Sequence, residues 1–283
     1  MEEKKKILTL DLIKSYTDDL WEQERAENTI HKYQHDLQML HQWLDGRALS
    51  KPVLMQWKKH LTMLYAAASV NSMLAAVNGC LKYAGWRELM VRPLKIQKSI
   101  FCDENKEMSK EEYIRLVKTA KKEGNERMAL VLQTICATGI RVSELRFITV
   151  ESVRTGYAKI SNKGKLRTIF LPDKLCRLLK PYIKKQRYST GSVFVTRTGK
   201  PLDRSNIWRD MKKLCKNAKI EAEKVFPHNL RHLFARVYYS IEKDISRLAD
   251  ILGHANIGTT RIYIMESGKV HARQMEQMGL VIT

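Results

Sequence analysis

The sequence is poor in glycine and proline, with 13 and 6 among 283 residues, and it has no run of about 18 apolar residues. The first shortage excludes collagen-like and low-complexity chains. The hydrophobic content of 44% argues against disorder, because it supplies enough apolar surface to offset the entropy lost on folding. Without a long apolar run we expect no membrane span. The charged residues 1–6 contain no apolar signal core, so we expect no secretion signal either.

Cysteine is also sparse, and its spacing is uninformative for metal binding. The five cysteines stand at positions 80, 102, 136, 176 and 215, and none forms a Cys-x-x-Cys pair. An odd number at wide spacing argues for a reducing compartment and against a structural zinc site. We therefore expect a cytoplasmic protein without a bound metal.

Acidic residues are few compared with basic ones. The chain has 51 Lys and Arg against 30 Asp and Glu, a formal net charge of +21. Such an excess favours a polyanionic partner, nucleic acid first, over a generic basic face on a ribosome-associated or membrane-surface protein. Residues 1–100 carry a net charge of +4 and residues 101–283 carry +17, so the second part of the chain is the more basic.

Apolar spacing predicts two domains of different type, which the length of the chain also favours. Helices are expected over 10–22, from a cap at Asn28-Thr29 to Gly46, over 52–64 and over 69–84, with Thr9 and Pro52 at their starts. We predict a helical domain over 1–95, a linker over 96–107 and a second domain over 108–283.

The second domain mixes helices with a hairpin. Ser109 and Glu112 form a capping-box pattern, and an apolar helix is expected over 127–137. Residues 156–171 read as a hairpin with a basic turn, and 193–196 as a short strand before helices from about 204 onward. The predicted fold class is therefore mainly α with a small antiparallel β-sheet.

Five short segments of the second domain carry residues suited to holding a phosphate. They are Thr138-Gly139-Ile140-Arg141-Val142-Ser143-Glu144-Leu145, the hairpin lysine Lys163, His228-Asn229-Leu230-Arg231-His232, Leu252-Gly253-His254 and Thr259-Thr260-Arg261-Ile262-Tyr263. In order and spacing these segments resemble the boxes of the tyrosine recombinase (phage integrase) superfamily. The resemblance covers roughly residues 110–265. The first domain resembles the helical core-binding, SAM-like domain of the same family.

The resemblance implies a phosphoryl transfer in which the hydroxyl oxygen of Tyr263 attacks a DNA phosphodiester, giving a 3′-phosphotyrosyl link and a free 5′-hydroxyl. Arg141 and Arg231 would neutralise the non-bridging oxygens as permanently charged forks. Lys163 would protonate the leaving oxygen. His228 would exchange a proton with Tyr263. No metal, ATP or other cofactor is implied.

The remaining assignments are less direct. His254 would donate a hydrogen bond to a phosphate oxygen. Glu144 would orient Arg141 or a neighbouring residue, or it would form an ordinary helix salt bridge. Either Lys163 or Lys165 could be the general acid. His232 has the spacing of a metal pair with His228, but Asn229 replaces the required glutamate, so we expect a structural histidine. The candidate DNA contacts are Lys165, Arg167, Arg209, Lys212 and Lys213. The last three lie on a predicted basic helix, which could equally be a solvent-exposed face.

By resemblance, the chain is the simple two-domain form found in Xer-type recombinases and mobile-element integrases of bacteria and phages. It would close as a clamp around double-stranded DNA with an inverted-repeat core site, as a dimer on one site and a tetramer on two, with a directionality factor in some systems. The tail, 267–283, would pack on a neighbouring protomer or on its own domain through Val270, Met275, Met278, Leu280 and Val281. A type IB topoisomerase and a catalytically idle DNA-binding protein are the alternative functions.

Overall fold

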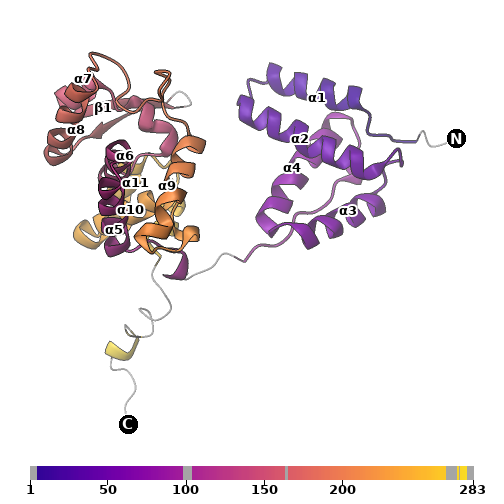
Figure 1. Cartoon of the computed structure of the whole chain (residues 1–283). Helices are drawn as coiled ribbons and strands as arrows, with labels where there is room; N and C mark the ends of the chain where they lie inside the picture. Colours follow the sequence, from indigo (N-terminus) through magenta and orange to yellow (C-terminus); the bar gives the residue numbers. More distant parts are fainter. Residues whose placement is uncertain (1–4, 98–103, 163–164, 266–272, 274, 279–283) are drawn as a thin grey trace, which may run out of the picture. The chain divides into compact units, whose positions relative to one another are not determined.

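The structure, a computed structural model, describes residues 5–97, 104–162, 165–265, 273 and 275–278. The chain divides into two compact units, Met1–Lys98 and Ser99–Thr283 (Figure 1). The predicted linker, 96–107, contains the boundary between these units. In the described part of the chain no helix is both long and apolar enough to cross a membrane.

The first unit is a helical bundle with its own core. Its elements are α1 (Leu10–Glu22), α2 (Glu27–Leu44), α3 (Lys51–Leu64), α4 (Ala67–Tyr83) and the 3₁₀ turn η1 (Arg87–Leu89). The side chain of Thr9 caps α1 and that of Ser50 caps α3, with Pro52 in its first turn. Trp57 of α3 and Leu37 of α2 are fully buried between the helices, which confirms the predicted helical bundle.

The start of α2 differs from the prediction. The helix begins at Glu27 and its N-cap is Ala26, which makes no side-chain cap hydrogen bond. Asn28 and Thr29, predicted as caps, therefore lie in the first turn. Burial of the apolar face of α2, including Leu37 and Leu40, stabilises the helix without the cap that local sequence would favour.

The second unit holds the small sheet and most of the helices. Its elements are η2 (Glu104–Lys106), α5 (Lys110–Lys122), α6 (Glu126–Thr138), η3 (Val142–Phe147), α7 (Val150–Thr155), β1 (Tyr157–Asn162), β2 (Lys165–Phe170), α8 (Asp173–Lys185), α9 (Arg204–Ala218), η4 (Ala222–Lys224), α10 (Pro227–Glu242), α11 (Ile245–Leu252), α12 (Ile257–Arg261) and η5 (Ile262–Ile264). Ser109 and Glu112 form the predicted capping box of α5.

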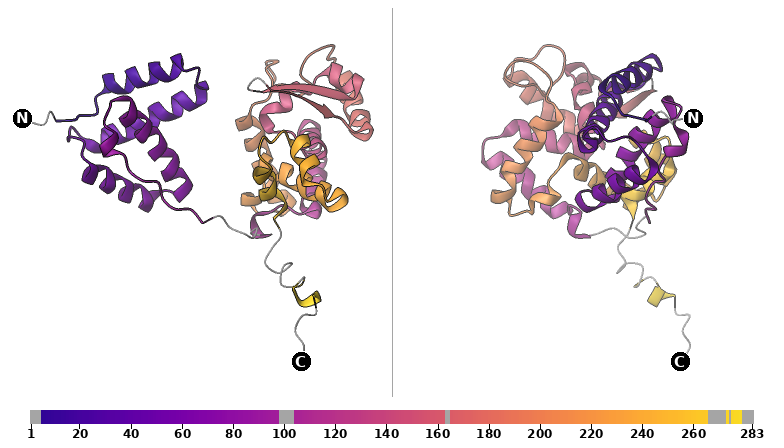
Figure 2. Two further views of the ribbon diagram at one scale, coloured as in Figure 1. Left: turned by 180° about the vertical axis from the view of Figure 1, so that it is seen from behind. Right: turned by 90° about the vertical axis from the view of Figure 1, so that its right-hand side faces the viewer.

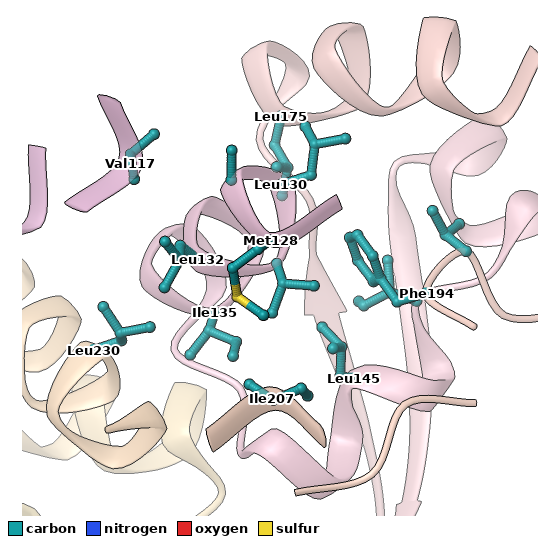
Figure 3. Close-up of a cluster of buried hydrophobic side chains, with 14 of the residues drawn as sticks. Val117, Met128, Leu130, Leu132, Ile135, Leu145, Leu175, Phe194, Ile207 and Leu230 are labelled. Atoms are coloured by element: carbon teal, nitrogen blue, oxygen red, sulfur yellow. The ribbon is translucent and has the colours of Figure 1, made fainter. Parts of the chain in front are cut away.

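Helix α6 is the centre of this unit and packs against α5, α8, α9 and α10. Five consecutive residues, Met128 to Leu132, are buried and apolar, as expected for a helix segment surrounded by protein. In Figure 3 Met128, Leu132 and Ile135 of α6 lie among Ile207 of α9 and Leu230 of α10. This core fixes the C-terminal end of α6, where the Thr-Gly segment begins, relative to α10.

The hairpin forms as predicted, with β1 and β2 antiparallel in one two-stranded sheet (Figure 2, left). The predicted strand at 193–196 was wrong: Ser192 and Val195 make only isolated bridges, to Thr149 and Pro201. No neighbouring strand extends these bridges among the described residues. Helix α8 was not predicted, although its buried Leu175, Leu179 and Ile183 have helical spacing. The mainly helical fold class with a small antiparallel sheet is confirmed.

Candidate active site

Helices α6 and α11 both end at a glycine, and carbonyl groups at their C-terminal ends lie close enough to bind one side chain. Gly139 after α6 and Gly253 after α11 have φ of 64° and 65°, the left-handed conformation that favours glycine. Each glycine is also in close contact. A Cβ would lie 2.4 Å from Cδ1 of Phe234 at Gly139 and 2.8 Å from Cδ of Arg167 at Gly253. Both turns therefore require glycine for conformation and for space.

Arg231, on α10, joins these two helix ends. Its Nη1 donates to the carbonyl of Gly139 at 2.5 Å, and its Nη2 donates to the carbonyl of Leu252 at 2.7 Å. Helix C-termini carry partial negative charge, which stabilises a buried cation there. The side chain is 1% exposed, and burial, followed by the nearby Arg141, lowers its pKa to about 10. Arg231 is therefore still charged at neutral pH.

Arg141 and Glu144 form the second part of the cluster. The buried carboxylate of Glu144 accepts from the backbone N–H of Arg141 at 2.7 Å and from its Nη1 at 3.1 Å. Nη1 of Arg141 also lies 3.5 Å from the carbonyl of Leu252, the oxygen that Arg231 uses. The predicted role of Glu144 in orienting Arg141 is consistent with these bonds.

Tyr263, on η5, lies among three histidines and is 7% exposed. Its hydroxyl oxygen is 3.3 Å from Nε2 of His228. Its ring centroid is 4.3 Å from that of His232 and 5.2 Å from that of His254. The guanidinium carbon of Arg231 is 6.0 Å from the ring centroid. The tyrosine hydroxyl therefore lies beside a group that can accept its proton.

His228 and His254 are both held neutral at physiological pH. Desolvation, followed by neighbouring cationic side chains, lowers the pKa of each from 6.5 to about 4. Nδ1 of His254 lies 2.8 Å from Oγ1 of the buried Thr260, and its Nε2 lies 2.9 Å from Nη2 of Arg231. Because the arginine can only donate, Nε2 of His254 is the acceptor and Nδ1 carries the proton.

A cavity of about 650 Å³ opens beside these groups. Arg141, His228 and Arg231 line one part of it, and Arg204, Trp208 and Lys212 line another. Nε of Arg231 is buried without a partner among the described residues. Arg204 and Trp208 were not predicted as site residues. Their position one turn apart at the start of α9 was the only signal in the sequence.

The structure brings together six of the residues predicted to catalyse the reaction or support it: Arg141, Glu144, His228, Arg231, His254 and Tyr263. Lys163 lies outside the described residues, and of Lys165 only the backbone, at the start of β2, is described. Arg167 lies inside the cluster, bonded to Glu144. The choice between Lys163 and Lys165 as general acid stays open.

The other candidate DNA contacts lie on α9. Arg209 and Lys213 are exposed, and Lys213 is 3.4 Å from Asp210. Lys212 donates to the carbonyl of Ala222 while lining the cavity. Their contact with DNA stays a prediction.

His232 contacts a carboxylate that the sequence analysis missed. Its Nδ1 lies 3.1 Å from Oε1 of Glu107, and Oε2 of the same carboxylate lies 3.5 Å from Nη2 of Arg236. No group of three or more His, Cys, Asp or Glu side chains with metal-binding geometry occurs in the described ranges. Of the tail residues, Met275 and Met278 are exposed, whereas Val270, Leu280 and Val281 lie outside the described residues.

A buried tyrosine beside a neutral histidine, with paired arginines at one cavity, defines a class of enzyme that attacks phosphodiesters with a tyrosine oxygen. Comparison with known families agrees with this interpretation. The phage integrase family matches residues 106–269, and the N-terminal SAM-like domain of phage integrases matches residues 13–88. Because the first match covers more than half of the chain, this chain belongs to the phage integrase family. It is a tyrosine site-specific recombinase that acts on DNA.

Curated relatives are similar over nearly the whole chain. Tyrosine recombinase XerD of Vibrio vulnificus is 27% identical over 279 residues, covering 89% of each chain. Tyrosine recombinase XerA of Pyrococcus furiosus is 27% identical over 288 residues, covering 98% of this chain and 97% of its own. The similarity to these Xer-type recombinases thus extends over both units of the chain.

Solved structures share the fold. A lambda integrase tetramer bound to a Holliday junction aligns with 91% of this chain and 77% of its own, with a TM-score of 0.75 at 16% identity. XerH recombinase bound to its difH substrate in a pre-cleavage complex aligns with 89% of this chain and 79% of its own, with a TM-score of 0.68 at 20% identity. At these identities the likeness concerns the fold alone.

Proposed function

We propose that Tyr263 is the nucleophile of strand cleavage and that the site recombines DNA through a 3′-phosphotyrosyl intermediate. The observation that carries this proposal is the 3.3 Å separation between the Tyr263 hydroxyl and Nε2 of a neutral His228. A nucleophile within hydrogen-bond reach of a base, and beside fixed cations, is the arrangement that covalent phosphoryl transfer requires.

The cleavage step follows from these groups. The oxygen of Tyr263 bonds to phosphorus while the bond from phosphorus to the 5′-oxygen breaks. The phenol proton passes to Nε2 of His228, and the leaving oxygen takes a proton from a hairpin lysine, Lys163 or Lys165. Attack by a 5′-hydroxyl of the partner strand reverses each transfer and releases the tyrosine. Because the phosphotyrosyl link retains the energy of the phosphodiester, strand joining needs no ATP.

Arg141 and Arg231 stabilise the charge that grows on the non-bridging oxygens. Both line the cavity, and both have terminal nitrogens held on protein oxygens, so their positions are set before DNA arrives. The unpartnered Nε of Arg231 supplies a further donor for an anion. His254 contacts the phosphate only after a change at Nε2, which now accepts from Arg231.

We base a proposal for how this protein assembles on DNA on solved structures that share its fold. Lambda integrase has been solved as a dimer bound to a core site and as a tetramer bound to a Holliday junction. We infer that this chain likewise binds an inverted-repeat core site as a dimer and pairs two sites as a tetramer, with its two units closing around the duplex. We also propose a cytoplasmic, nucleoid-associated location, and assistance from a directionality factor in some systems.

The test is covalent trapping on a nicked suicide substrate that carries the core site. Wild type should form a DNA–protein adduct that a 3′-phosphotyrosyl bond accounts for, and Tyr263→Phe should form none while binding DNA with unchanged affinity. Tyr239→Phe, on α10, is the matched control and should form the adduct normally. An adduct in Tyr263→Phe would overturn the assignment.

Products of the wild type separate the remaining functions. Relaxation of supercoiled DNA without recombinants would identify a type IB topoisomerase. Absence of any adduct with the wild type would identify a DNA-binding protein without catalysis.

A further inference from the structure

We propose that Arg167, on strand β2, is a positioning residue for strand cleavage: it neutralises Glu144 and so leaves the charge of Arg141 to the scissile phosphate. This inference rests on the proposed function, because it concerns the phosphate that Tyr263 attacks. It replaces the expectation that Arg167 is one of the contacts to the DNA backbone.

The bonds of Arg167 go to the protein rather than outward. Its Nη2 lies 2.5 Å from Oε2 of Glu144, and its Nη1 donates to the carbonyl of Ile251 at 2.6 Å. The side chain is 15% exposed. Both terminal nitrogens are therefore engaged before DNA binds, one with a carboxylate and one with the end of α11.

The charges around Glu144 give these bonds a function. One buried carboxylate lies between two guanidinium groups: Oε1 accepts from Arg141 and Oε2 from Arg167. With both arginines present, the pair around the carboxylate keeps a net positive charge, to which Arg231 adds. Without Arg167, the same carboxylate would have Arg141 as its only guanidinium partner and would cancel its charge. Buried charges are screened little by solvent, so this change would be felt at the phosphate.

A second observation, independent of the charges, concerns the turn after α11. The aliphatic part of Arg167 fills the space beside Gly253, where a Cβ would come within 2.8 Å of its Cδ. Gly253 directly precedes His254, and Leu252 directly before it supplies the carbonyl that Arg141 and Arg231 share. Arg167 thus packs on the turn that places both this carbonyl and His254.

The experiment measures single-turnover cleavage at saturating DNA with Arg167→Ala, Arg167→Gln and Arg167→Lys. A misplaced or neutralised phosphate-binding group costs about 100-fold in rate, and we expect this loss for Ala and Gln. Lysine keeps the charge and should recover a large part of the rate. Lys159→Ala removes an exposed cation from the paired strand β1 and is the matched control, expected to cleave at the wild-type rate.

Two altered substrates identify the step that Arg167 serves. A methylphosphonate at the scissile position removes the charge that Arg141 neutralises, so the penalty of Arg167→Ala should shrink there as the penalty of Arg141→Ala does. A 5′-bridging phosphorothiolate leaves as a thiolate without needing a proton, so it should restore a variant of the general acid but not Arg167→Ala. Circular dichroism and thermal unfolding establish that each variant is folded.

Several outcomes would overturn the inference. Cleavage by Arg167→Ala at the rate of Lys159→Ala would remove the role altogether. Rescue by the phosphorothiolate alone would place Arg167 with the leaving-group proton. Weaker DNA binding with normal cleavage at saturation would make it a DNA contact. Equal rates for Lys and Gln would show that its charge is irrelevant. If the wild type forms no adduct, the proposed function fails and the inference fails with it.

Discussion

The cationic side chains of the second unit occupy two contrasting surroundings. Arg231 is 1% exposed and is held by helix-end carbonyls, whereas the side chain of Lys213 on α9 is 70% exposed and has Asp210 as its partner at 3.4 Å. The first environment fixes a charge in place before DNA arrives. The second leaves the charge to water and counterions. The buried arginine therefore provides a charge at a fixed position for catalysis. The exposed lysine is expected to contribute to the affinity for DNA.

The strongest test of this contrast is Arg231→Ala. It removes the donor to Gly139 and one donor to Leu252, both buried, and we expect cleavage to fall by at least about 100-fold. Unpaired buried acceptors also lower the free energy of unfolding by about 1–3 kcal/mol. Single-turnover cleavage and urea unfolding measure the two effects. Arg231→Lys separates the effect on cleavage from the effect on stability. If this variant is stable but does not cleave DNA, the loss of cleavage is due to the missing phosphate contact.

The exposed cations of α9 should affect DNA binding and leave cleavage unchanged. Replacing both Arg209 and Lys213 by alanine should weaken DNA binding, and should reduce the slope of log affinity against log salt by about one for each lost phosphate contact. Cleavage at saturating DNA should stay at the wild-type rate. The matched control is Lys174→Ala with Lys184→Ala on α8, which removes the same charge. An unchanged slope would show that this part of α9 is a solvated face.

The last prediction concerns the dependence of stability on pH. The pKa values of His228 and His254 are lowered to about 4 in the folded chain from an ordinary 6.5. Between these values the unfolded chain binds protons that the folded chain does not, so stability should fall as the pH drops from about 6.5 towards 4. Chemical denaturation across this range measures the slope. His228→Gln should have a shallower slope, and an equal slope would contradict the assigned cause.

Features that depend on residues close together in the sequence could be predicted from it, whereas features that depend on contacts with other segments could not. The boxes around Arg141, Arg231 and Tyr263 are local patterns. The structure brings the two arginines to one cavity and places Tyr263 beside His228, which also lines it. The start of α2 depends on burial of its apolar face rather than on a side-chain cap. In place of the strand predicted at 193–196, Ser192 and Val195 make only isolated bridges. At both places the local signals gave a wrong prediction. The helical spacing of Leu175, Leu179 and Ile183 in α8, by contrast, is a local signal that was sufficient to predict the helix.

Arg167 shows the limit most clearly. A basic residue in a basic hairpin reads as a DNA contact, because its partners lie far away in the sequence: Glu144 is 23 residues away and Ile251 is 84. Glu107 is another case, since its partner His232 is 125 residues away. Neither contact leaves a trace in spacing or composition. Only the folded chain reveals them, because it brings β2 to η3 and α11, and α10 to the segment before α5.

The acceptors that hold the arginines have an evolutionary consequence. The carbonyls of Gly139, Ile251 and Leu252 belong to the main chain, and Glu144 is the one side-chain carboxylate shared by Arg141 and Arg167. A point mutation can change any side chain, but it cannot delete a peptide oxygen. Substitution of Ile251 or Leu252 therefore leaves these acceptors in place as long as the helix still ends there, although the buried Leu252 also packs in the core around Tyr263. Mutational fragility is concentrated instead at Glu144 and at the two glycines that end the helices.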